Sequence, residues 1–446
     1  MSVWKSLGFS NSPYDANPLR PVQEDVDFLV GRNEETTELC TALEAGDHGF
    51  LFISGVPGVG KTSFFNVTQF LLESSQAPFG RHLMCARRLC PIHPGATAIS
   101  VARSALANLI KSVEDYCRLA NRPIPSETQK LSKWVGDVGS GGYQIGVTIL
   151  GCGGSLGRNV SLPKFSEASF EKIVEAYSVV TAEIVVALNF QGAFMVLDNI
   201  ENLEERHCAD LLLAFRDTLF TCPNLWWIII GQSGLASLIK TLEPRVFERS
   251  AGIGLELKPI SLRLLHEAIE KRVHRFHASG DGNAPLPEVV HKHLYHASHG
   301  EIRFVFKYSN DICFKFITAI RQGVLDSRLK HVEEALNESL GRALVQAQIP
   351  EQRAEKILRL IIETELTGLN LKQKEKELLR LIGHHGSARA SEFKKFGLKS
   401  SQDFSSNFLS KFFKLNLLRR TQEGRSVVYK LRGMSALASE YSLLTD

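Results

Sequence analysis

The sequence predicts an α/β protein in which a parallel sheet is followed by helical domains. Strand-like apolar runs alternate with helical patterns as far as about residue 260, which is typical of a parallel sheet with crossover helices. From residue 261 to about 345 the apolar spacing is mostly helical, and a second helical region of basic composition begins near Glu351. The strand-like runs are GFLFIS at 49–54, AFMVLD at 193–198, LWWIII at 225–230 and IGLEL at 253–257.

The chain length of 446 residues is sufficient for two or three domains. We expect an extended N-terminal arm over residues 1–29, the sheet domain over 30–260, a helical domain over 261–345 and a basic C-terminal domain over 350–446. One stretch fits the sheet pattern badly, because it is rich in glycine around an alternating segment. We interpret it as a β-hairpin inserted at about 136–162, and a disordered loop is the alternative.

The composition argues against secretion and against a metal framework. Eight cysteines are scattered without a regular spacing, as expected for reduced thiols in the cytoplasm. The sequence contains neither a signal-peptide pattern nor eighteen consecutive apolar residues, so we expect a cytoplasmic protein that does not enter a membrane. His82, Cys85, Cys90 and His93 lie close together in sequence but lack the spacing of zinc modules, and we do not expect a zinc site there.

A glycine-rich motif directly follows the first strand. Residues 55–62 read GVPGVGKT, which satisfies G-x-x-x-x-G-K-[ST]. The glycines let consecutive N–H groups face an anion, and the helix that begins near Lys61 adds the positive end of its dipole. Lys61 would reach the β- and γ-phosphates of ATP, and the Thr62 hydroxyl would bind Mg²⁺. The predicted nucleotide contacts in this loop are Gly55, Pro57, Gly58, Val59, Gly60, Lys61, Thr62 and Ser63.

A second apolar run ends in a carboxylate about 140 residues after the glycine-rich motif. We expect Asp198, at the end of a strand next to that of the motif, to share the Mg²⁺ ion with Thr62. Nucleotide hydrolases with such a motif usually have an acidic residue directly after the magnesium-binding aspartate, where it polarises the attacking water. This chain has Asn199 at that position, and asparagine is not a base. Glu201 is the candidate replacement, and a solvated loop carboxylate is the alternative. We therefore expect slow hydrolysis.

The motifs around this loop resemble those of initiator-type AAA+ ATPases, the origin-recognition class and its bacterial relatives. VGRNEE at 30–35 is similar to the family's vGR-x-E box, which implies that Arg32 lies near the adenine. GQS at 231–233 follows a strand at the place of the family's polar γ-phosphate sensor. We assign this implied role to Gln232, and Ser233 is the alternative. The resemblance implies an AAA+ P-loop domain with a helical lid and a C-terminal winged helix, and with ATP and Mg²⁺ as cofactors.

Two arginines extend this resemblance. PRVFERS at 244–250 is similar to the segment that carries the family's arginine finger, which implies that Arg249 acts on the nucleotide of a neighbouring subunit. Its planar, permanently charged fork suits a transferring phosphoryl group, although an ordinary surface charge is the alternative. SHGEIR at 298–303 is similar to the opening of the family's lid helix, which implies that Arg303 reads the γ-phosphate.

The C-terminal region is strongly basic. Residues 371–432 contain fifteen Lys and Arg against five Asp and Glu, which gives this segment +10 while the rest of the chain carries −6 of the overall +4. Its pattern of three helices and two short strands predicts a winged helix-turn-helix, and the charge favours nucleic acid as the partner. Expected phosphate contacts on the wing are Arg419, Arg420, Arg425 and Lys430. The polar face of the third helix would contain Ser401, Gln402, Ser405, Ser406, Asn407 and Lys411, opposite Phe404, Phe408, Leu409, Phe412 and Phe413.

Together these features predict an ATPase that assembles into homo-oligomers on duplex DNA, with ATP as the assembly switch. Replication initiation, regulation of transposition or recombination, and mobile-element or anti-phage defence are all compatible, with a nuclease, recombinase or other effector as partner protein. The alternative is a signalling NTPase of the STAND type, whose winged helix contacts protein instead of DNA.

Overall fold

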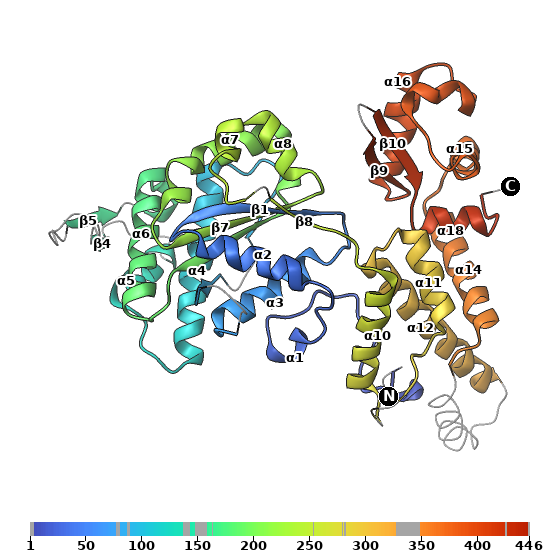
Figure 1. The fold of residues 1–446 in the computed structure, drawn as a ribbon, viewed down its shortest axis with the longest axis horizontal. Coiled ribbons are helices and arrows are strands. Elements are labelled where there is room, and N and C mark those ends of the chain that lie inside the picture. The colour runs from blue at the N-terminus through green and yellow to red at the C-terminus, as the bar shows by residue number, and fades with distance from the viewer. Residues whose placement is uncertain are drawn as a thin grey trace. The chain divides into compact units, whose positions relative to one another are not determined.

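The computed structural model describes residues 4–76, 81–86, 90–136, 143–147, 158–162, 164–252, 254–278, 280, 282–326, 348–423 and 426–444. The chain divides into two compact units. The sheet unit is Pro18–Lys258, and the helical unit combines Met1–Asn17 with Pro259–Asp446 (Figure 1).

The sheet unit is built on a parallel sheet. Its strands follow the order β2-β6-β7-β1-β8, and β3 also pairs with β6; all of these pairs are parallel. β6 and β7 are buried along their whole length, which explains their continuous apolar sequences. The predicted α/β class with a parallel sheet is therefore confirmed. The strands are β1 (Gly49–Gly55), β2 (Met84–Cys85), β3 (Cys90–Pro91), β6 (Ala193–Asp198), β7 (Leu225–Gly231) and β8 (Leu255–Leu257).

Helices cover both faces of this sheet (Figure 1). Alternate residues of β1 point to opposite faces, so Phe50 and Phe52 join one core while Leu51 and Ile53 join the other. The first core is closed by α4, α6, α7 and α8, and the second by α2 and α3. Outside the sheet, β4 (Tyr143–Val147) pairs antiparallel with β5 (Arg158–Leu162). The helices are α1 (Gln23–Val26), α2 (Asn33–Glu44), α3 (Lys61–Glu73), α4 (Ala98–Leu119), α5 (Ser126–Gly136), α6 (Phe170–Val186), α7 (Glu205–Arg216), α8 (Leu235–Leu242) and α9 (Pro244–Phe247).

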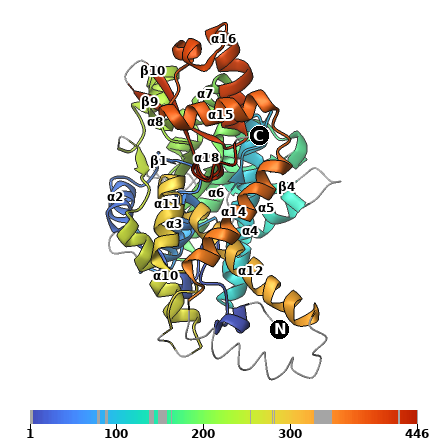
Figure 2. The same ribbon diagram turned by 90° about the vertical axis from the view of Figure 1, so that its right-hand side faces the viewer.

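The helical unit begins with part of the N-terminal arm. Tyr14 is fully buried in its core, where the hydroxyl accepts a hydrogen bond from the Leu286 N–H at 3.2 Å and lies 3.0 Å from Nε2 of His291. α12 packs against α11 and α14, and α18 packs against α11 and α14 (Figure 2). The elements are the 3₁₀ turn η1 (Trp4–Leu7), α10 (Leu262–Phe276), α11 (Glu288–Ser298), α12 (Ile302–Asp326), α14 (Glu351–Gly368) and α18 (Met434–Glu440).

The basic residues 372–431 form what we call the C-terminal module. It comprises α15 (Gln373–His385), the 3₁₀ turn η5 (Ala390–Phe396), one continuous helical stretch, and an antiparallel hairpin of β9 (Leu418–Glu423) and β10 (Ser426–Leu431). The continuous stretch consists of α16 (Ser401–Asp403), the π-helical η6 (Phe404–Leu409) and α17 (Ser410–Lys414). Phe404, Leu409 and Phe412 are buried, as predicted for one face of this stretch, whereas Phe408 and Phe413 are half-buried. Among the described residues, no helix combines the length and the apolar character needed to cross a bilayer.

Candidate functional site

The glycine-rich motif forms the connection between β1 and α3. β1 ends at Gly55, α3 begins at Lys61, and Gly58 and Gly60 have positive φ angles of 77° and 97°. Residues with side chains rarely adopt this left-handed conformation, so both positions favour glycine. A Cβ atom on Gly55 would lie only 2.8 Å from the carbonyl oxygen of Leu257. The backbone of this loop therefore curls as a phosphate cradle requires.

The Lys61 side chain folds back over the loop. Its Nζ donates hydrogen bonds to the carbonyl oxygens of Gly55 at 2.7 Å and Val56 at 3.4 Å. Thr62 follows in the first turn of α3 and is half-buried. The lysine ammonium and the threonine hydroxyl thus lie at the helix end where the dipole favours an anion.

Arg32 holds the same loop through its side chain. The arginine is buried; its Nη2 donates to the carbonyl oxygen of Val59 at 3.0 Å, and its Nη1 contacts Oε1 of Glu35 at 2.6 Å. The guanidinium therefore links α2 to the loop of residues 55–62, which we call the phosphate loop. The adenine contact that the family resemblance implies for Arg32 stays a prediction.

The Ser63 hydroxyl forms a hydrogen bond with the N-terminal arm. Its Oγ accepts a hydrogen bond from the Leu19 N–H at 3.1 Å, and the Asn66 side chain donates to the Leu19 carbonyl at 2.7 Å. α3 therefore holds the arm one residue after Thr62. Nothing in the sequence around Asn66 signals this contact, because it joins positions 47 residues apart.

Asp198 lies at the same edge of the sheet as the phosphate loop, since the parallel strands β1, β6 and β7 all end there. We expected its strand to be the neighbour of β1, and this detail is wrong: β7 lies between β1 and β6. Asp198 is buried, and its Oδ1 accepts a hydrogen bond from the N–H of Asn199 at 2.9 Å. Asn199 itself is left-handed, with φ of 59°, which turns the chain sharply after β6.

The charges of Lys61, Asp198 and Glu201 influence one another. Burial raises the pKa of the Asp198 carboxyl above its ordinary value, while the Asn199 N–H and Lys61 oppose that rise. Partial desolvation also raises the pKa of Glu201, although the residue as a whole is exposed; Lys61 lowers it and Asp198 raises it further. Oε2 of Glu201 lies 3.5 Å from where a Cβ on Gly231 would sit, so the carboxylate reaches the end of β7.

These groups fit a magnesium nucleotide. Within the part of the chain that the structure describes, no three His, Cys, Asp or Glu side chains gather as a metal cluster. Mg²⁺ in phosphate sites needs only one or two protein oxygens, because phosphates and water complete the octahedron. The buried carboxylate of Asp198 and the hydroxyl of Thr62 suit that requirement.

The three remaining predicted residues occupy different places. Gln232 is exposed and directly follows β7 at the site's edge of the sheet. Arg249 is exposed after α9, and its Nη1 contacts Oδ1 of Asp217 at 2.5 Å, a partner that the sequence does not signal. Arg303 is exposed in the first turn of α12 and belongs to the helical unit.

The C-terminal module presents only some of its predicted contact residues. Arg420 and Gln402 are exposed, whereas Arg419 is half-buried and its pKa is lowered by burial and by the nearby Arg432. Lys411 has a carboxylate partner that the sequence does not signal, because its Nζ lies 2.6 Å from Oε1 of the buried Glu375. The predicted contact Arg425 lies outside the described residues.

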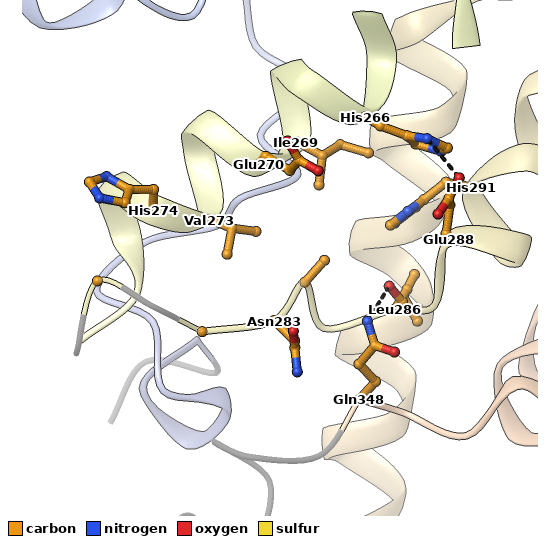
Figure 3. A pocket seen from close by; sticks show the side chains of 13 residues that line it. His266, Ile269, Glu270, Val273, His274, Asn283, Leu286, Glu288, His291 and Gln348 are labelled. Atoms are coloured by element: carbon orange, nitrogen blue, oxygen red, sulfur yellow. Dashed lines mark hydrogen bonds and ion pairs between the residues drawn. The ribbon is translucent and has the colours of Figure 1, made fainter. Parts of the chain in front are cut away.

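A separate cavity of about 550 Å³ lies in the helical unit (Figure 3). His266, Glu288 and His291 line one side of it, and Nδ1 of His266 lies 3.0 Å from Oε1 of Glu288. Burial, with His266 contributing, lowers the pKa of His291 to about 3. The residues predicted to bind nucleotide do not line this cavity, so it is distinct from the phosphate loop.

Similarity to known proteins is found among solved structures. No family model matches the sequence, and no curated protein matches it. Similar solved structures include the Orc2 protein of Aeropyrum pernix in ADPNP–ADP complexes, with a TM-score of 0.45 and 13% identity over 98% of this chain and 97% of that one. The Aeropyrum pernix Orc1 protein in complex with DNA gives 0.43 and 16% over 95% and 96%, and Cdc6p of Pyrobaculum aerophilum gives 0.39 and 13% over 98% and 97%. These neighbours are initiator AAA+ proteins, the class that the sequence motifs resemble.

Proposed function

We propose that this chain binds ATP with Mg²⁺ in the loop between β1 and α3 and hydrolyses it. The observation that carries the proposal is the joint geometry of the site. Gly58 and Gly60 curl the loop at the start of α3, where Lys61 and Thr62 lie, and the buried Asp198 ends a strand at the same edge of the sheet. Backbone N–H groups, the helix dipole and one lysine suit a polyphosphate.

Each residue then has a defined task. Lys61 exchanges its contacts with the Gly55 and Val56 carbonyls for charge-assisted contacts with phosphate oxygens. Thr62 and Asp198 hold Mg²⁺, which neutralises charge on the transferring phosphoryl group when it is bound. Arg32 keeps the loop in its curled form through the Val59 carbonyl.

Glu201 is the proposed base that activates water. Its carboxylate lies at the end of β7, close enough to Lys61 and Asp198 for their charges to shift its pKa. A raised pKa makes a carboxylate a better proton acceptor near neutral pH. Because it stands two residues beyond the usual position, we expect slow turnover.

Gln232, Arg249 and Arg303 complete the proposed γ-phosphate contacts. Gln232 is exposed at the correct edge of the sheet, and Arg303 starts an exposed helical turn. Arg249 is exposed and paired with the exposed Asp217, and such surface pairs contribute little stability. Breaking its pair with Asp217 therefore costs little free energy, so Arg249 can contact the nucleotide of a neighbouring subunit instead. This role implies a homo-oligomer.

We further propose that the C-terminal module is a winged helix that binds duplex DNA. Its order of three helical segments and a hairpin, its exposed Gln402 and Ser406, and the exposed Arg420 on β9 support this reading. The net charge of +10 on residues 371–432 exceeds what solubility requires. Replication initiation, control of transposition or recombination, and defence with an effector partner are equally compatible with these features.

Two measurements test this function. A nucleotide-dependent thermal shift should appear in the wild type and vanish in Lys61→Ala, while Lys130→Ala, which removes an exposed lysine paired with Glu127, should keep it. If ATP stabilised Lys61→Ala as much as the wild type, this loop would not be the nucleotide-binding site. Fluorescence anisotropy with duplex DNA should detect binding that tightens with ATP. Nucleotide binding without any DNA binding would favour the signalling NTPase.

A further inference from the structure

The segment Ser298–Arg303 packs against the start of the helical unit. The hydroxyl of Tyr295, just before it, donates to the carbonyl of Ile260 at 2.8 Å. A Cβ atom on Gly300 would lie 2.8 Å from Cβ of Pro259, so only glycine fits against that proline. This segment therefore rests on the first residues that follow the sheet unit in the chain.

The same segment is also bonded to the end of the C-terminal hairpin. Nε and Nη2 of Arg432 both contact Oε2 of Glu301, the first at 3.1 Å, and the two side chains are only 11% and 15% exposed. Nε2 of His299 lies 3.0 Å from the carbonyl oxygen of Leu431, and the Gly433 N–H donates to the carbonyl of Ala297 at 2.8 Å. Three separate contacts thus join α11 and the turn after it to the last residue of β10 and the two residues that follow it.

The turn between α11 and α12 is conformationally restricted. His299 and Gly300 both have positive φ angles, 57° and 84°, and a left-handed histidine persists only where its surroundings hold it. α12 begins at Ile302, so Glu301 is the last residue of the turn and Arg303 lies in the first helical turn. Only Ile302 therefore separates the paired carboxylate of Glu301 from Arg303.

Arg432 belongs to a group of neighbouring cations on the hairpin. Burial lowers the pKa of Arg419, and the charge of Arg432 lowers it further. Burial also lowers the pKa of His299, against its hydrogen bond with Leu431, and Arg419, Lys430 and Arg432 add to that effect. An anion that binds beside Arg419 and Lys430 would attract Arg432 and repel Glu301. These charge–charge interactions are stronger where side chains are buried, because less water screens them.

We propose that Glu301 and Arg432 are positioning residues that couple phosphate binding on the hairpin to the placement of Arg303. Duplex DNA on β9 and β10 competes with Glu301 for Arg432. When Glu301 loses this partner, the turn at His299 and Gly300 relaxes and Arg303 moves. The affinity of the phosphate loop for ATP changes as a result. This inference rests on the proposed function, because it needs both DNA and ATP as ligands. It adds a specific connection between the two, carried by residues 131 positions apart in the chain.

The test measures mutual effects of the two ligands. Duplex affinity is determined with and without a non-hydrolysable ATP analogue, and analogue affinity with and without duplex, for the wild type and Glu301→Gln. The glutamine keeps the shape of the side chain and removes its charge without altering the hairpin. Asp311→Asn is the matched control, since it removes a carboxylate on the helix that follows Glu301, and its partner Lys307 has a side chain that is 49% exposed.

In the wild type each ligand should change the affinity of the other by the same factor, of about fivefold or more. In Glu301→Gln this factor should fall toward one, and duplex affinity without nucleotide should rise, because no carboxylate then competes with the duplex for Arg432. Asp311→Asn should keep both the wild-type factor and the wild-type affinity. Arg432→Gln and the double variant should lose no more coupling than Glu301→Gln, because both residues act through one pair. If Glu301→Gln fails to fold, Arg432→Lys keeps the charge, loses the two-nitrogen contact and should show a partial loss.

A wild-type factor in Glu301→Gln, or additive losses in the double variant, would overturn the inference. A wild type that binds both ligands without any mutual effect would overturn it too and leave the proposed function standing. If the wild type binds no duplex or no nucleotide, the proposed function itself is wrong.

Discussion

The buried guanidinium of Arg32 donates a 3.0 Å hydrogen bond to the carbonyl oxygen of Val59, in the middle of the phosphate loop. The second partner of the guanidinium is the carboxylate of Glu35. Removing the arginine would leave a buried carbonyl and a charged group without their partner, which typically costs about 1–3 kcal/mol. The loop is thus held in its curled form by a residue that precedes it by 27 positions.

We expect Arg32→Ala to weaken ATP and GTP binding by a similar factor, roughly tenfold for about 1.4 kcal/mol of lost loop stabilisation. Titration calorimetry with both nucleotides measures this, and Arg245→Ala, an exposed arginine of the same unit, serves as control. Loss of discrimination between ATP and GTP would instead support the adenine contact that the family resemblance implies.

Hydrolysis should depend on Glu201. Turnover should stay below about 1 s⁻¹, the lower end of typical enzyme rates, and Glu201→Gln should lower it further without changing ATP affinity, since amides are not bases. Steady-state phosphate release reports the rate. Glu205→Gln, an exposed carboxylate at the start of α7, should behave as wild type. An unchanged rate in Glu201→Gln would mean that another group activates the water.

Arg420 should contact DNA phosphate. It is exposed on β9, so Arg420→Ala should weaken binding to duplexes of any sequence and reduce the slope of log affinity against log salt by roughly 0.9, the value for one phosphate contact. Gln402→Ala should alter sequence preference and leave the slope unchanged. Anisotropy titrations at several salt concentrations test both, and an unchanged slope for Arg420→Ala would place the DNA surface elsewhere.

The free energy of unfolding should fall in acid because of His291. Its pKa is lowered from 6.5 to about 3 by burial, so between these values the unfolded chain binds a proton that the folded chain does not. Stability from this residue is therefore complete above pH 6.5 and decreases as the pH falls, by up to about 1.4 kcal/mol per pH unit. Urea denaturation between pH 7 and 4 should show a flatter dependence in His291→Gln. His274→Gln, which removes an exposed histidine, should keep the wild-type dependence.

The features whose chemistry is local could be predicted from the amino-acid sequence. The eight residues 55–62 contain both the glycines that curl the loop and the Lys61 and Thr62 that follow it, so their spacing alone predicts the cradle. Apolar strands buried on both faces likewise predict the parallel sheet and place Asp198 at its carboxyl edge.

The contacts between groups that are distant in the sequence follow from the packing of whole elements and could not be predicted. This packing places β7 between β1 and β6, pairs Lys411 with Glu375, and joins Glu301 to Arg432. An apolar run predicts a buried strand, but it does not show which strand lies beside it. An arginine in the sequence likewise does not show which carboxylate it will meet in the folded chain. Such pairings depend on how whole elements pack, because only packing brings residues 36 or 131 positions apart within hydrogen-bonding distance.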